Sequence, residues 1–533
     1  MADGAAAMEM AEPDALSRLE GLFARWDSAS APGLAVGIRH RGEIVFRRAY
    51  GMASLEARRA LTPRSRIRIG STSKHMTALL ALLLAEEGLL DLDAPLRRWL
   101  PELIGPEGEG TLRQHAQHRA GGRCYFDLSV IAHLDAVPPA GRALDLACRQ
   151  AGRNFAPGSA MIYCNSSYHL MALAIERAGG APFETLLRDR LFSPLGMHDT
   201  ASIPDDREIV PGMATLHVPA AGGGWRRGLF PNPDVRGEGA VVSTIDDMLI
   251  WTAHLLSRDR FGNAESWRQL LERPAYPDDA NGKYALGLIH GEHRGRAVIY
   301  HAGGVIGGLS QMLIFPDEAL EIVILANGAP EADPAALALA AADIVLGEDA
   351  QASPPVPAPA GLAGSWASHA TGMIYHLAAD EAGLRLGVVG GPPVVPLTPR
   401  DGGAWIAEPP TLSPLVVDPA ELAKGAIRIR FGGAAARYHP RRDGERPDSL
   451  PARLLAAPDA EAEARFERTA ERDLLHISDP FGTNTMALDW HDHRIALATA
   501  TRPGLPYTAA ILLDTDGAAF TLNTARTRWL RFT

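Results

Sequence analysis

The chain has 533 residues, of which 46% are hydrophobic and 22% are charged, and its net charge is −11. This composition is typical of a folded globular protein and excludes collagen, coiled coil and general disorder. The acidic balance also argues against a nucleic-acid partner, because such proteins usually carry a basic excess. At roughly 150 residues per domain, we expect three to four domains.

Cysteine content and apolar runs indicate the cellular compartment. The three cysteines, Cys124, Cys148 and Cys164, are too few for a disulfide framework. The first twenty residues lack the basic segment and apolar stretch of a signal peptide, and no run approaches the 18 apolar residues that span a membrane. We therefore predict a cytoplasmic protein without membrane contact.

The first 350 residues combine helical and strand patterns. Apolar residues at helical spacing predict a helix over 14–26, and two apolar runs around Arg41 and Gly42 predict a β-hairpin. A buried helix is expected to begin near Ser71 and to end at Gly88. Further helices are expected over 168–178, 182–191 and 333–346 and after a capping pair of Thr244 and Asp247, with strands within 297–300 and 310–325. Strands at both ends of this region predict an α/β (α+β) domain, an antiparallel sheet covered by helices.

Two polar or proline-rich stretches divide the rest of the chain. Residues 351–360 and 441–451 have no periodicity and are predicted to be linkers. The predicted domains are therefore 1–350, 361–440 and 452–533. The last two show short alternating runs between turns, including one at Asp516-Gly517, which indicates small β-sandwiches or closed barrels.

Lys74 is conspicuous because only three of the 52 basic residues are lysines. It follows Ser71 by three positions, so on a helix the two side chains share one face. A serine hydroxyl needs an adjacent base to act as a nucleophile, and a desolvated lysine can be that base. A solvated surface lysine is the ordinary alternative, but the apolar helix disfavours it.

Two other short segments carry polar groups suited to the same chemistry. Tyr163 and Asn165 form a Tyr-x-Asn triplet, and His301 is followed by Ala302, Gly303 and Gly304. A tyrosine can share a proton with serine or lysine, and glycine at a strand edge lets a substrate approach the backbone. Taken singly, the triplet is usually a turn and a lone histidine is usually structural.

Together the three segments resemble the serine β-lactamase and penicillin-recognising hydrolase family. That family carries S-x-x-K, Y-x-N and then K-T-G or H-x-G in this chain order. Segments 111–122 and 157–200 are also similar, and the resemblance covers about residues 15–347. The chain length and the two β-modules resemble the D-aminopeptidase branch, which implies two antiparallel, lipocalin-like β-barrels and a loop of the second barrel that reaches the active site.

The resemblance implies a serine hydrolase that releases N-terminal D-residues, D-Ala above all and also Gly, from short peptides, amides and esters through an acyl-enzyme. It implies a substrate with a free amine and no cofactor, and for such a soluble enzyme we expect a homodimer. The implied catalytic residues are Ser71, Lys74, Tyr163 and His301, and the implied substrate-binding residues are Asn165, Gly303 and Gly304. Backbone N–H groups of Ser71 and Gly304 would form the oxyanion hole.

The family places an acidic residue of the last barrel at the substrate amine. Asp479, Asp489 and Asp492 are candidates, and distance from the chain end favours Asp492. The pairs His115/His118 and His491/His493 lack a further cluster of ligands, so no metal site is predicted.

Other activities remain open for such a catalytic domain. They are a D-Ala-D-Ala carboxypeptidase, a β-lactamase, an esterase, or a non-catalytic penicillin- or peptide-binding protein. Dependence on a free substrate amine distinguishes an aminopeptidase from all of them.

Overall fold

The structure is a computed structural model. It describes residues 13–533 apart from 134–138, 221, 230–232, 275–282, 349–355, 382, 390–394, 401, 408–414, 432–433, 443–444 and 502–506. The start of the chain, half of the first predicted linker and two residues of the second therefore lie outside the described residues. No described helix is long and apolar enough to cross a membrane.

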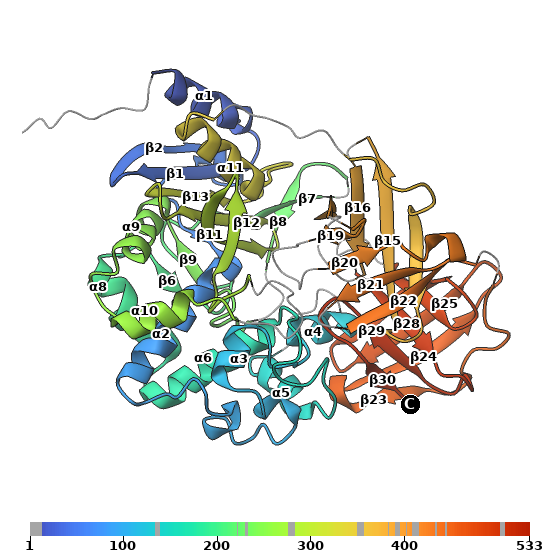
Figure 1. Cartoon of the computed structure of the whole chain (residues 1–533). Helices are drawn as coiled ribbons and strands as arrows, with labels where there is room; N and C mark the ends of the chain where they lie inside the picture. The colour runs from blue at the N-terminus through green and yellow to red at the C-terminus, as the bar shows by residue number, and fades with distance from the viewer. Residues whose placement is uncertain are drawn as a thin grey trace, which may run out of the picture.

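Six antiparallel strands form the sheet of the first domain, in the order β10-β11-β12-β13-β1-β2 (Figure 1). Strands from the beginning of the domain thus pair with strands from its end, as predicted. The predicted hairpin is β1–β2, and Arg41 and Gly42 adopt the positive φ angles of 51° and 88° that its tight turn requires. The strands are β1 (Leu34–His40), β2 (Glu43–Tyr50), β10 (Ile289–His293), β11 (Arg296–Val305), β12 (Gly308–Phe315) and β13 (Leu320–Ala326).

Helices cover both faces of this sheet because its side chains alternate between two apolar cores. Val36 and Ile38 of β1 face α1 (Pro13–Phe23) and α11 (Pro334–Val345), whereas Ala35 belongs to the opposite core with α9 (Ile245–Ser257). Gly37 lets α9 lie close to the strand, since a Cβ atom there would come within 2.5 Å of Ile245. Figure 1 shows α1 and α11 on one side and the remaining helices on the other.

Helix α2 (Lys74–Glu86) is the centre of the larger core, and all of its residues from Lys74 to Leu84 are buried. It continues a 3-10 turn, Gly70–Ser73, and packs against α6 (Asn165–Gly179) and α10 (Ala264–Leu271). The predicted helix at 182–191 divides into α7 and a π-helical turn that ends at Phe192. The other elements are α3 (Leu112–Ala116), α4 (Tyr125–His133), α5 (Arg142–Arg149), α7 (Phe183–Leu187), α8 (Ser193–Leu195), β3 (Met52–Ser54), β4 (Arg59–Ala60), β5 (Ile67–Arg68), β6 (Ala201–Ser202), β7 (His217–Pro219), β8 (Trp225–Arg227) and β9 (Val241–Ser243).

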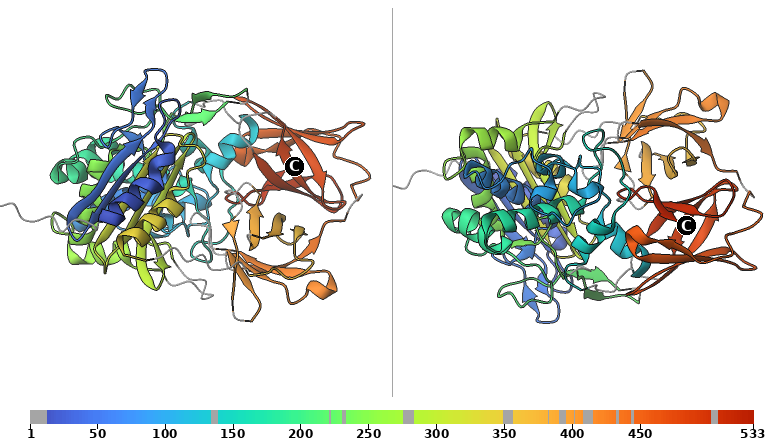
Figure 2. Two further views of the ribbon diagram at one scale, coloured as in Figure 1. Left: turned by 90° about the horizontal axis from the view of Figure 1, so that it is seen from above. Right: turned by 90° about the horizontal axis from the view of Figure 1, so that it is seen from below.

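The remaining strands form two antiparallel sheets that curl into barrels side by side (Figure 2). In the first, residues 395–399 pair with β16 at one end and with β19 at the other, so the two edges of the sheet meet in one segment. Its strands are β14 (Gly364–Ser368), β15 (Met373–Asp380), β16 (Gly383–Val388), β17 (Val395–Pro396), β18 (Thr398–Pro399), β19 (Trp405–Ala407), β20 (Leu415–Asp418), β21 (Ile427–Phe431) and β22 (Ala434–Pro440).

The second barrel is closed by two backbone hydrogen bonds of 3.0 Å between Ala456 and Thr533, which join β23 to β30. Its strands are β23 (Leu455–Ala457), β24 (Ala462–Arg468), β25 (Asp473–Asp479), β26 (Gly482–Trp490), β27 (Ile495–Ala500), β28 (Thr508–Leu513), β29 (Phe520–Asn523) and β30 (Leu530–Phe532). The predicted fold class, a β-lactamase-like domain followed by two barrels, is confirmed. The domain boundaries stay predictions.

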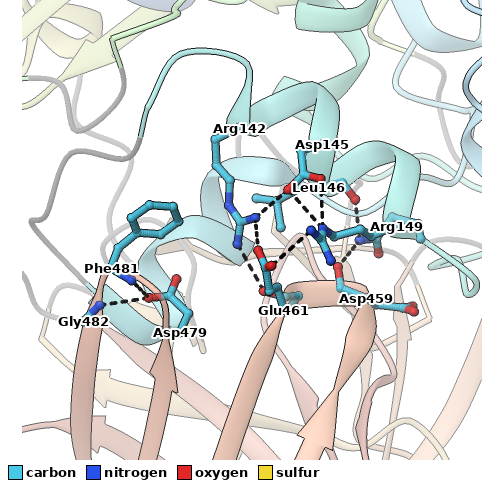
Figure 3. A network of polar contacts seen from close by, with 11 residues as sticks. Arg142, Asp145, Leu146, Arg149, Asp459, Glu461, Asp479, Phe481 and Gly482 are labelled. Atoms are coloured by element: carbon cyan, nitrogen blue, oxygen red, sulfur yellow. Dashed lines mark hydrogen bonds and ion pairs between the residues drawn. The ribbon is translucent and has the colours of Figure 1, made fainter.

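Helix α4 of the first domain fixes the second barrel in place. Its residues Leu128 and Ile131 are part of the apolar core of that barrel, and Asn484 Nδ2 donates a 3.0 Å hydrogen bond to the backbone oxygen of Ile131. An ionic network lies beside it, in which Glu461 of the barrel pairs with Arg142 at 2.5 Å and with Arg149 at 3.1 Å (Figure 3). The barrel is therefore held by both apolar and charged contacts.

Candidate active site

Lys74 stands at the centre of the candidate site, one helical turn after Ser71. Its Nζ lies 3.0 Å from Ser71 Oγ, 3.0 Å from Asn165 Oδ1 and 2.6 Å from the backbone oxygen of Glu238. Burial lowers the pKa of Lys74 to about 7. A neutral amine has two hydrogens and one lone pair. Because the two carbonyl oxygens accept both hydrogens, the lone pair is left for the hydroxyl of Ser71.

Tyr163 lies beside Lys74, with its ring centroid 4.9 Å from Nζ. It is 1% exposed, and burial raises the pKa of its hydroxyl while the neighbouring Ser71 opposes that rise. The hydroxyl makes no hydrogen bond of normal geometry within the described part of the chain. It therefore remains able to exchange a proton with a bound molecule.

The start of α6 is fixed by His118, whose Nδ1 accepts a 3.1 Å hydrogen bond from the backbone N–H of Cys164. The His118 ring also packs on Tyr163 at a centroid distance of 4.1 Å. This contact positions the Tyr163–Asn165 segment against Lys74. His118 entered the sequence analysis only as a possible metal ligand, and no local signal indicated this packing role.

Strand β11 lies directly against the turn that carries Ser71. Gly303 is buried, and a Cβ atom there would lie 1.9 Å from the backbone oxygen of Ile69, so only glycine permits this approach. Gly304 is exposed, and its backbone lies beside that of Gly70. Gly303 therefore allows close packing and does not form an open strand edge. The backbone of Gly304 lies near the turn that carries Ser71.

His301 contacts this cluster only indirectly. Its Nδ1 donates to the backbone oxygen of Ala302 at 2.6 Å, and its Nε2 accepts from the Tyr284 hydroxyl at 3.0 Å. Burial lowers the pKa of His301 to about 3, so the ring is neutral. Its centroid is 6.5 Å from that of Tyr163. The sequence contained no motif that singled out Tyr284.

Glu238 is a further residue of the site that the sequence did not single out. Its carboxylate accepts hydrogen bonds from the Tyr125 hydroxyl at 2.7 Å and from the backbone N–H of Arg236 at 3.1 Å. Burial opposes ionisation, but His169 and the Tyr125 hydroxyl lower the pKa of Glu238. The buried, ionised side chain thus fixes the backbone oxygen that holds Lys74.

The turn between β29 and β30 (residues 524–529) brings the second barrel to the site. The Arg526 guanidinium carbon lies 5.3 Å from the ring centroid of Tyr163. Asn154 of the first domain donates a 2.9 Å hydrogen bond to the backbone oxygen of Arg526. Among the described contacts, this turn is therefore the segment of the barrel that meets Tyr163.

The three acidic candidates lie outside this cluster of contacts. Asp492 accepts hydrogen bonds from His369 at 2.8 Å and from the backbone N–H groups of Arg494 and Ile495, so its carboxylate closes the β26–β27 turn. Asp489 pairs with Arg441, and Asp479 accepts from backbone N–H groups within its own turn. No described contact brings Asp492 to Ser71, Lys74 or Tyr163.

The histidines considered as metal ligands have other partners. The ring of His115 contacts Ser167 Oγ and the backbone oxygen of Glu107, both at 3.3 Å, and His491 Nε2 contacts the backbone oxygen of Ser365 at 3.0 Å. Within the described ranges, no group of three or more His, Cys, Asp or Glu side chains could hold a metal ion.

A buried Ser-x-x-Lys pair with a tyrosine at its side, on this fold, defines a penicillin-recognising serine hydrolase. The Beta-lactamase family model matches residues 21–346, and the chain belongs to that family. A D-aminopeptidase of Cereibacter sphaeroides (strain ATCC 17023) is 30% identical over 71% of this chain and 70% of its own. The resemblance seen in the sequence is thereby confirmed.

Solved structures agree on the fold. An octameric penicillin-binding protein homologue from Pyrococcus abyssi covers 97% of this chain and is itself covered fully, with a TM-score of 0.57 and 16% identity. D-amino acid amidase from Ochrobactrum anthropi covers 63% of this chain and is covered to 98%, with a TM-score of 0.52 and 24% identity.

Proposed function

We propose that the chain is a D-stereospecific aminopeptidase, a serine hydrolase that releases an N-terminal D-residue from short peptides, amides and esters. The observation that supports the proposal is the environment of Lys74 Nζ. This atom is buried, lies 3.0 Å from Ser71 Oγ and is bound by two further oxygens. The D-aminopeptidases at 30% identity support the D-stereospecificity.

In the first half of the reaction, Ser71 Oγ attacks the substrate carbonyl carbon while its proton passes to Lys74 Nζ. The backbone N–H groups of Ser71 and Gly304 stabilise the negative oxygen of the tetrahedral intermediate. Asn165 orients the substrate, because its amide is fixed by Lys74. The intermediate collapses to an acyl-enzyme when the carbon–nitrogen bond breaks.

The leaving nitrogen takes a proton from Tyr163, which is restored by the proton held on Lys74. Water then attacks the acyl-enzyme, the same groups accept its proton, and Ser71 leaves with a proton restored to Oγ. His301 acts as a positioning residue, because it contacts Tyr284 and not the reacting atoms.

Hydrolysis of three p-nitroanilides tests this function. The wild-type enzyme should cleave D-Ala-p-nitroanilide and should leave the L-Ala and N-acetyl-D-Ala forms intact, and Ser71→Ala should abolish the reaction. Cleavage of the acetylated form would identify a hydrolase that does not need the amine. Turnover of simple esters or lactams alone would point to an esterase or β-lactamase, and no turnover would point to a binding protein.

We further propose a cytoplasmic homodimer without nucleic-acid or membrane partners. The acidic charge and the lack of a described membrane-spanning helix support the absence of such partners. Light scattering after gel filtration measures the assembly, and fractionation of cells measures the location. A periplasmic enzyme or a monomer would contradict this proposal.

A further inference from the structure

Arg526 is half-buried and has no ion-pair partner among the described residues, although Asp127 and the Cys124 thiol raise its pKa electrostatically. Its Nε is buried without a hydrogen-bond partner, and no described residue forms an ion pair with its guanidinium. Buried charged groups are normally paired, because removal from water is costly. An arginine cannot escape this cost by losing its proton. An anionic ligand would complete the pairing of the buried side of this guanidinium.

The carboxyl group with the largest electrostatic effect on Arg526 is that of Asp127, which is engaged elsewhere. Asp127 accepts a 2.5 Å hydrogen bond from Thr524 Oγ1, and burial raises the pKa of its carboxyl to about 7. It interacts electrostatically with Arg526 but forms no ion pair with it. Near neutral pH, Asp127 is thus only partly charged and leaves the guanidinium available.

The turn that carries Arg526 is held rigidly by the first domain. Asn154 binds it on both sides of Thr527, donating to the backbone oxygen of Arg526 and accepting from the backbone N–H of Arg528 at 2.7 Å. Arg123 donates to the backbone oxygens of Arg528 and Trp529, both at 2.8 Å. A fixed backbone turn reduces the conformational entropy that its side chain loses on binding an anion.

We propose that Arg526 binds the free carboxylate of the residue that leaves, so that the enzyme favours dipeptides. The inference rests on the proposed function, in which Tyr163 faces the leaving nitrogen. In a dipeptide, the C-terminal carboxylate is one Cα atom away from that nitrogen, and Arg526 lies next to Tyr163. Arginine binds carboxylates through two parallel hydrogen bonds.

Three substrates with the same acyl group test the proposal: D-Ala-Gly, D-Ala-Gly-amide and D-Ala-p-nitroanilide. The wild-type kcat/KM should be at least about tenfold higher for D-Ala-Gly than for its amide, since a charge-assisted pair replaces a neutral contact. Arg526→Gln should remove this preference and leave the p-nitroanilide within about twofold of wild type, measured above the acidic limb of the pH profile. Arg526→Lys should restore part of the preference.

Arg528→Gln is the matched control, because it removes one positive charge from the same turn. The Arg528 guanidinium lies 5.2 Å from the Phe431 ring of the first barrel, so the preference should persist. Equal wild-type rates for the dipeptide and its amide, or an equal loss on all three substrates in Arg526→Gln, would overturn the inference. If wild type does not cleave D-Ala-p-nitroanilide, the proposed function fails and the inference with it.

Discussion

The turn at residues 70–74 and the turn at residues 524–529 meet at one site but are built in opposite ways. Ser71 and Lys74 are placed by a single helical turn, so their contact follows from local geometry. Arg526 reaches the same site only because a whole barrel is docked by α4 and by the Glu461 network. The contact between nucleophile and base is therefore encoded locally, whereas the proposed selection of substrate depends on contacts distant in sequence.

The basic residues of the two turns also differ in their protonation. Burial, together with the nearby charge of Arg526, lowers the pKa of Lys74 to about 7, although Glu238 opposes this change. Arg526 keeps its charge. Two basic residues a few ångströms from the same tyrosine ring are therefore suited to two tasks, a proton acceptor and an anion anchor.

The largest loss of activity is expected from a substitution in the turn at residues 70–74. Lys74→Met should lower kcat/KM for D-Ala-p-nitroanilide by about 10³- to 10⁴-fold, because Ser71 loses its base. Lys424→Met, a change of the same kind in a short helix of the first barrel, should have no effect. If Lys74→Met retained more than a tenth of the activity, another group would have to be the base, and the role assigned to the turn at residues 70–74 would be wrong.

Tyr163→Phe should have the next largest effect and should depend on the leaving group. A loss of about 10²-fold is expected for the p-nitroanilide, whose nitrogen must be protonated, and a smaller loss for an activated p-nitrophenyl ester. Tyr438→Phe removes a hydroxyl bound to Thr371 in the first barrel and should change neither rate. An equal loss on both substrates would show that Tyr163 serves Ser71 and not the leaving group.

The sequence predicted the residues of the locally encoded turn because i,i+3 spacing fixes their contact. It also located Tyr163, Asn165 and His301 through segments similar to the family, and the structure brings Asn165 into contact with Lys74 and Tyr163 alongside it. His301 illustrates the limit of such reasoning, because its rotamer and its partner Tyr284 depend on packing around β11.

Arg526 could not be predicted in this way. It is one of many arginines, and its short turn carries no motif. Its placement depends on Leu128 and Ile131 of α4. Their sequence suggests core residues of the first domain, but they belong to one apolar cluster with the residues of the second barrel. Distance from the chain end favoured Asp492 instead, and that carboxylate caps a turn between strands.

The pH profile of kcat/KM tests this comparison further, because it measures how the charge of Arg526 affects the pKa of Lys74. kcat/KM should fall about tenfold per pH unit below about 7, since protonated Lys74 cannot accept the proton of Ser71. Arg526→Gln removes a neighbouring positive charge, so the pKa of Lys74 should rise and the acidic limb should move upward by roughly half a unit. Arg528→Gln should leave the limb in place, and a downward shift in Arg526→Gln would contradict this coupling.

The smallest expected effect concerns how the barrel turn is held. Asn154→Ala removes the hydrogen bonds to Arg526 and Arg528 without touching either guanidinium, so the preference for D-Ala-Gly over its amide should fall by about threefold. Cleavage of D-Ala-p-nitroanilide should not change. Asn263→Ala, which removes a helix cap at α10, controls for loss of stability. A preference fully retained in Asn154→Ala would mean that Arg123 and Thr524 suffice to fix the turn, and a loss on the p-nitroanilide would mean that the turn also supports the chemistry at Ser71.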